Sequence, residues 1–97
     1  MNKEKEKSYV GRCFKYLNSW GDETWWEYLT ITGSDGLFLE GISFETSARG
    51  VKRIRKEAQI AKSGLNYHWI EIKQAEFDAA WTALLTDINR IAVELAE

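Results

Sequence analysis

The last quarter of the chain carries the pattern that most restricts the possible folds. From Gln74 onward, large apolar residues recur at intervals of four, three, four, three and four, and these residues are Phe77, Trp81, Leu84, Ile88, Ile91 and Leu95. This spacing places them on one face of an α-helix. We therefore predict an amphipathic helix over residues 74–97, and the rest of the chain must cover its apolar face.

The preceding residues favour short strands. Residues 24–32 are almost wholly aromatic and β-branched, and residues 37–46 follow them after the turn sequence Gly-Ser-Asp-Gly. This arrangement is typical of a β-hairpin. Residues 9–17 and 66–72 are predicted as the first and last strands, because each contains aromatic residues with partial alternation.

Residues 51–60 are compatible with two structures. Their apolar residues fit one face of a helix that stops at Gly64, whereas residues 51–56 also fit a basic strand at the edge of a sheet. We favour the strand, because Lys and Arg at a sheet edge prevent pairing with other chains.

Together these segments predict an α+β fold: an antiparallel five-stranded twisted sheet or small open barrel with one C-terminal amphipathic helix. A chain of 97 residues has room for one core, which we assign to a single domain over residues 8–97. Residues 1–7 alternate Lys and Glu and are expected to form a flexible charged arm. No membrane span or signal peptide is visible, so we expect a cytoplasmic protein.

The net charge of −2 conceals a strong division along the chain. Residues 16–48 contain six acids and no Lys or Arg, whereas residues 49–62 contain six Lys and Arg against one Glu. Such a concentration of cations on an acidic chain favours a binding surface for phosphates or an acidic protein. The residues that we predict for this basic stretch are Arg49, Lys52, Arg53, Arg55 and Lys56.

Aromatic residues suggest a second binding surface. In extended strands, Trp26 and Tyr28 point to one side of the sheet, and Tyr67 and Trp69 share a face of the last strand. One helix covers only one face of a sheet, so these four residues are candidates for an exposed aromatic platform. The alternative is that a closed barrel buries them as core.

The sequence contains no recognisable catalytic or metal-binding pattern. One His and one Cys cannot supply a metal-ligand cluster, and no nucleophile, zinc or nucleotide motif occurs. Glu40, Glu45 and Glu71 would share a proton only if the sheet brought them together. We therefore expect a protein that is not an enzyme and has no cofactor or metal.

The predicted helix is longer than the sheet it covers. Its 24 residues extend ~36 Å, whereas a strand of six residues covers only ~20 Å. Ile88, Ile91 and Leu95 continue the apolar stripe beyond the sheet. We predict that a second copy of the chain covers them in a homodimer, with a helix that bends, or that lies across a larger barrel, as the alternative.

Four segments between Val10 and Trp81 carry a further signal. They are G-R-C-F-K-Y-L-N (residues 11–18), W-W-E-Y-L-T-I (25–31), I-S-F-E-T (42–46) and W-I-E-I-K-Q-A-E-F-D-A-A-W (69–81). These segments resemble a group of small uncharacterised accessory proteins of bacteriophages and prophages, whose shared motifs are hydrophobic and structural. Such proteins often begin the helix with Ser-Glu-Glu, where this chain has Lys73, Gln74 and Ala75.

The resemblance implies a function by stoichiometric binding, in the cytosol of a host cell. Phage accessory proteins of this size include inhibitors of host antiviral defence, which bind an immune protein or sequester its nucleotide signal. The alternative is a nucleic-acid-binding module that uses the basic stretch and the aromatic platform. The acidity of the whole chain argues against this alternative, because nucleic-acid-binding domains are usually basic overall.

Overall fold

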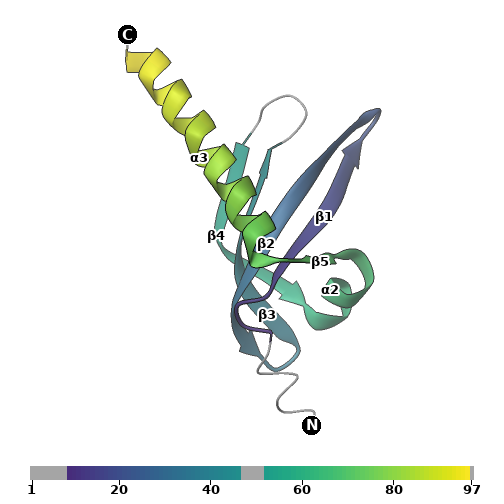
Figure 1. Cartoon of the computed structure of the whole chain (residues 1–97). Helices are drawn as coiled ribbons and strands as arrows, with labels where there is room; N and C mark the ends of the chain where they lie inside the picture. Colours follow the sequence, from purple (N-terminus) through teal and green to yellow (C-terminus); the bar gives the residue numbers. More distant parts are fainter. Residues whose placement is uncertain (1–8, 47–51, 97) are drawn as a thin grey trace.

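The computed structural model describes residues 9–46 and 52–96. Within them, five strands form one antiparallel open sheet in the order β4-β3-β2-β1-β5 (Figure 1). The strands are β1 (Cys13–Trp20), β2 (Glu23–Asp35), β3 (Phe38–Thr46), β4 (Lys52–Ala61) and β5 (Ile70–Ile72), and the helices are α2 (Lys62–His68) and α3 (Gln74–Ala96). The predicted α+β fold with an antiparallel five-stranded sheet and a C-terminal helix is confirmed, and the sheet is open rather than closed into a barrel. The predicted arm, residues 1–7, lies outside the described residues.

Two tight hairpins connect the first three strands. Gly21 and Gly36 each occupy the first position of a two-residue loop and have φ angles of 61° and 57°. A positive φ at this position matches the twist of the paired strands and favours glycine. The predicted hairpin is therefore confirmed, although β2 runs beyond the predicted end at Thr32 to Asp35.

Residues 52–72 confirm one prediction and contradict another. Four of the five predicted cations, Lys52, Arg53, Arg55 and Lys56, lie on strand β4, as favoured. The prediction of a strand over residues 66–72 is wrong in its first half, because residues 66–68 belong to α2 and only Ile70–Ile72 pairs with β1. The helical turn buries the Leu65 side chain, which is 1% exposed, against the sheet. Gly64 lies inside α2 and is not the end of a helix, as the helical interpretation of the preceding residues required.

The sheet carries an apolar cluster on each face, because successive residues of a strand point to opposite sides. One face, called the α2 face here, holds Phe14, Leu29, Ile31, Leu39, Ala58 and Leu65. The opposite face, called the α3 face, holds Cys13, Phe44, Phe77 and Leu84. The two helices thus cover opposite sides of the sheet.

Only the first half of α3 packs on the sheet. Phe77 and Leu84 are buried, whereas every residue from Asn89 to Ala96 is exposed. Figure 1 shows this second half projecting past the strands. The radius of gyration is accordingly 15.0 Å, against about 13 Å for a compact domain of 100 residues.

Candidate functional site

Strand β4 presents cations at one edge of the sheet. Within residues 9–46 and 52–96 it pairs with β3 alone, and the side chains of Arg53, Arg55 and Lys56 are exposed. Arg53 lies opposite Glu45 and Arg55 opposite Ser43, so the two arginines share a face of the strand, as predicted. None of the three cations forms an ion pair or side-chain hydrogen bond with the described residues. We call these three residues the basic edge.

The other two cations predicted for the basic stretch, Lys52 and Arg49, are not counted in the basic edge. Lys52 is the first residue of β4, and Arg49 lies outside the described residues. The basic edge is therefore defined by three of the five predicted cations.

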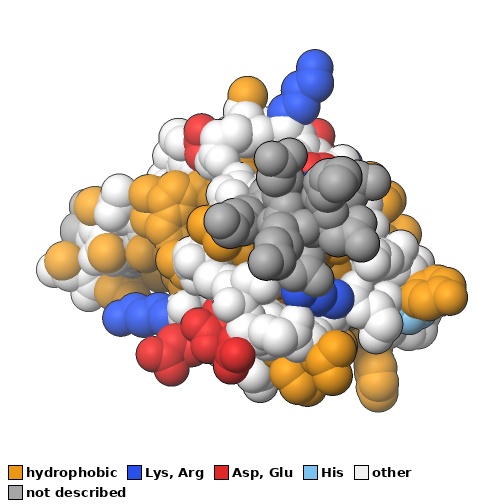
Figure 2. Space-filling model, turned by 90° about the horizontal axis from the view of Figure 1, so that it is seen from below, with side chains coloured by type: hydrophobic (Ala, Val, Ile, Leu, Met, Phe, Trp, Pro, Cys, Tyr) orange, Lys and Arg blue, Asp and Glu red, His pale blue; other side chains and the backbone are white. Residues whose placement is uncertain are grey.

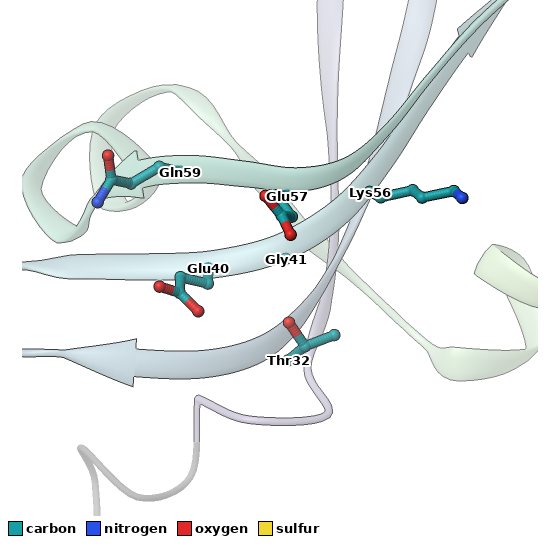
Figure 3. Close-up of a pocket in the computed structure, with 6 residues that line it drawn as sticks. All are labelled: Thr32, Glu40, Gly41, Lys56, Glu57 and Gln59. Atoms are coloured by element: carbon teal, nitrogen blue, oxygen red, sulfur yellow. The ribbon is translucent and has the colours of Figure 1, made fainter.

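A polar hollow of about 410 Å³ crosses β2, β3 and β4 on the α3 face (Figure 3). It is lined by Thr32, Glu40, Gly41, Lys56, Glu57 and Gln59. Figure 3 shows the Lys56 side chain extending away from the carboxylates of Glu40 and Glu57. Two carboxylates disfavour a phosphate in this hollow, because like charges repel strongly near a protein surface.

An apolar groove of about 460 Å³ separates α3 from β2 and β3. It is lined by Thr24, Trp25, Trp26, Tyr28, Phe44 and Thr46 of the sheet and by Ala80, Ala83, Leu84 and Asp87 of α3. Tyr28 and Phe44 stack with ring centroids 5.2 Å apart. We call this feature the aromatic groove. The wall that α3 contributes to this groove was not predicted from the sequence. The small residues Ala80 and Ala83 beside the apolar stripe could have indicated it, because they leave space next to the helix.

The four residues predicted for an aromatic platform do not share one surface. Trp26 and Tyr28 line the aromatic groove on the α3 face, whereas Trp69 packs against the cluster of the α2 face. Tyr67 lies on α2 and is 85% exposed. The platform was inferred from strand alternation over residues 66–72, and this inference fails because residues 66–68 are helical. Burial inside a closed barrel, the alternative, is also wrong, since the sheet is open.

The three carboxylates considered for proton sharing are far apart. Glu71 is on β5 and Glu40 on β3, with β1 and β2 between them, and three strand spacings amount to about 14 Å. Glu45 lies five residues after Glu40 on β3, on the opposite face of the sheet, and accepts a hydrogen bond from Trp25 Nε1 at 3.3 Å. The sheet therefore does not bring these acids into a catalytic pair.

Glu71 is instead an ion-pair partner of Arg12. Arg12 Nε and Nη2 each donate to a Glu71 oxygen at 2.8 Å, and this hydrogen bonding holds the pKa of Glu71 below its ordinary value. A carboxyl whose pKa is lower in the folded state stabilises the protein above its unfolded pKa and loses that contribution as the pH falls through the folded value.

We therefore expect Glu71→Gln to destabilise the protein at neutral pH and not in acid. The pair is half exposed to solvent, so the loss in free energy of unfolding at pH 7 should be below about 1 kcal/mol. Urea unfolding of both proteins should show this difference shrinking as the pH falls through the lowered pKa of Glu71, and vanishing once the carboxyl is protonated in the folded state as well. A difference that persists unchanged in acid would contradict the ion-pair explanation.

The residues predicted for self-association lie on the second half of α3. Ile88 is half-buried and packs against the cluster of the α3 face. Ile91 and Leu95 are 37% and 82% exposed. The stripe therefore leaves the sheet one turn after Ile88.

Residues 9–46 and 52–96 offer neither a metal site nor a membrane-spanning helix. No three His, Cys, Asp or Glu side chains of these segments lie close enough together to hold a metal ion. Neither helix of the described chain has the length and apolarity needed to cross a bilayer.

Comparison with protein-family models, curated proteins and solved structures gives no match for this chain. The basic edge and the aromatic groove are therefore the candidate binding surfaces of this chain.

Proposed function

We propose that this chain is a non-catalytic binding protein whose basic edge binds an acidic surface of a protein partner. One observation carries the proposal: Arg53, Arg55 and Lys56 are exposed on one strand without an anionic partner among the described residues. The chain as a whole has a net charge of −2. Cations collected in this way suit charge-assisted contacts with a complementary surface.

The position of the cations favours a protein partner over a nucleotide. β4 is an edge strand, and an edge strand offers backbone hydrogen-bonding groups to an added strand. An extended acidic segment would pair with this edge while its side chains meet Arg53 and Arg55. A nucleotide would instead need an enclosed site, and the hollow beside Lys56 contains two carboxylates.

The resemblance to phage and prophage accessory proteins supports a more specific form of the proposal. In that form the partner belongs to a host antiviral defence system, and stoichiometric binding inhibits it. The basic edge supplies the contact, and no chemical step is required of this chain.

The proposal is tested with the double variant Arg53→Ala, Arg55→Ala. Exposed charges contribute little to folding, so its free energy of unfolding should change by less than about 0.5 kcal/mol. Host proteins retained by the immobilised wild type should bind the double variant at least about tenfold more weakly, since two charge-assisted hydrogen bonds are lost. The matched control is Lys73→Ala, which removes an exposed cation distant from β4 and should retain full binding.

Two results would count against the proposal. Undiminished partner retention by the double variant would show that the basic edge is not the contact. Micromolar binding of a generic single-stranded oligonucleotide at physiological salt, weakening steeply as salt is raised, would favour the nucleic-acid alternative.

A further inference from the structure

The side chains of β4 alternate between the two faces of the sheet. Arg55 lies opposite Ser43, and Ser43 lies opposite Leu29 of the α2 face. Because cross-strand partners point to the same side of a sheet, Arg55 belongs to the α2 face. Arg53, two residues earlier on the strand, points to that side as well. This edge of the α2 face therefore carries two cations at two-residue spacing.

Ile54 lies between the two arginines and points to the other face. It pairs with Phe44 of the α3 face and is nevertheless 42% exposed, because no strand of the described residues lies beyond β4. Water solvates an isoleucine poorly, whereas a side chain of an added strand would cover it. The uncovered edge thus has the order cation, apolar residue, cation.

We propose that the partner of the basic edge presents an extended segment with the order acid, apolar residue, acid, which adds to β4 as a further strand. The two carboxylates face Arg53 and Arg55 on the α2 face, and the apolar side chain covers Ile54 on the α3 face. The order is the same in both chain directions, so parallel and antiparallel addition both satisfy it. This inference rests on the function proposed above and specifies the chemistry of its partner.

The charges near the edge agree with acids on an added strand. Glu45 is on the same face as the arginines but one strand farther in, and neighbouring strands lie about 4.8 Å apart. A carboxylate on the added strand is therefore nearer to the arginines than to Glu45. Seen from below in Figure 2, Lys and Arg side chains lie at separate points rather than in one patch. Recognition by a short pattern, rather than by a broad positive field, suits this distribution.

Two synthetic peptides of equal composition and charge test the proposal by NMR titration of the full chain. One alternates, Ser-Glu-Val-Glu-Val-Glu-Ser, and the other is rearranged to Ser-Glu-Glu-Val-Val-Glu-Ser, which has no two acids separated by one residue. The alternating peptide should bind at least about tenfold more tightly. The double variant Arg53→Ala, Arg55→Ala should lose this preference.

Ile54→Ser tests the apolar contact. The variant should stay folded, because the side chain is already partly in water, and it should bind the alternating peptide at least about threefold more weakly. The matched control is Ile70→Ser, since Ile70 is 53% exposed on β5 at the opposite edge of the sheet and should leave binding unchanged.

Methylation of peptide nitrogens tests whether the backbone pairs with β4. Successive residues of a strand direct their N–H groups to opposite sides. N-methylation of all glutamates, or of all valines, therefore blocks one side of the alternating peptide. One of these two methylated peptides should lose binding, and the other should retain it.

Three outcomes would overturn the inference. Equal binding of the alternating and rearranged peptides would show that charge acts without an ordered strand. Equal affinities of the two methylated peptides would exclude strand addition, and no binding of the alternating peptide up to about 1 mM would exclude such a segment as the partner. None of these results decides the function proposed for the basic edge, whose own failure would appear as undiminished retention of host proteins by Arg53→Ala, Arg55→Ala.

Discussion

Phe44→Ala is expected to lower the free energy of unfolding by about 3–5 kcal/mol, the largest effect of any change considered for this chain. Phe44 is 4% exposed and joins the sheet to α3. Its ring lies 5.2 Å from Tyr28, 5.4 Å from Phe77 and 5.3 Å from Trp81, measured between centroids. Removing the ring leaves a cavity where the helix docks, so the loss includes both burial and aromatic contacts.

The same strand offers a matched control for Phe44. Phe38 is 45% exposed at the other end of β3, and Phe38→Ala should cost about 1 kcal/mol or less. Urea unfolding measured at low protein concentration keeps self-association from contributing to the result. Equal losses for the two variants would contradict the assignment of Phe44 to the core beneath α3.

Gly41→Ala is expected to lower the free energy of unfolding by about 1–3 kcal/mol. Gly41 is buried between two register shifts of the sheet, one toward β2 and one toward β4. A Cβ atom there would collide with the backbone oxygen of Thr30 and lie 2.8 Å from Leu29 Cδ1. Both neighbours are fixed, because one is backbone and the other belongs to the core.

Gly33 provides the control for this strand glycine. A Cβ atom at Gly33 meets nothing closer than Glu40 Oε2 at 3.4 Å, so Gly33→Ala should change stability by less than about 0.5 kcal/mol. The two variants are compared by thermal or urea unfolding. If Gly41→Ala is as stable as the wild type, the strands must be able to move apart at the bulges, and the predicted collision would be contradicted.

The helix and strands with strong patterns were predictable from the sequence. The spacing from Phe77 to Leu95 located α3, because only helical periodicity brings those residues to one face. The cations of β4 resolved the ambiguity of residues 51–60, since they suit an exposed edge. The Gly-Ser-Asp-Gly sequence marked the second hairpin, but Gly33 and Ser34 pair with Glu40 and Leu39 instead of turning.

Helix α2 was not predictable, because a seven-residue helix derives its stability from tertiary contacts rather than from its own sequence. The burial of Leu65 supplies those contacts and is visible only in the fold. The same omission misplaced Tyr67, and with it the aromatic platform.

The candidate site was predictable in its charges and not in its shape. Exposure of Arg53 and Arg55 follows from their position on an edge strand. The shape of the aromatic groove depends on the angle between α3 and the sheet. The spacing of apolar residues in the sequence does not determine this angle. Strand alternation correctly placed Tyr28 and Leu29 on opposite faces of the sheet. It did not indicate which of these faces α3 covers.

Hydrogen–deuterium exchange of the chain, measured alone and in complex with any protein that the immobilised wild type retains, tests the central claim most directly. In the free chain the outward amides of the edge strand β4 should exchange faster than those of the central strand β2, which has neighbours on both sides. Binding at the basic edge should protect Lys52–Ala61 and leave the amides of β5, at the opposite edge, unchanged. Protection confined to other segments, with exchange in Lys52–Ala61 unaltered, would contradict the proposal that this protein acts through its basic edge.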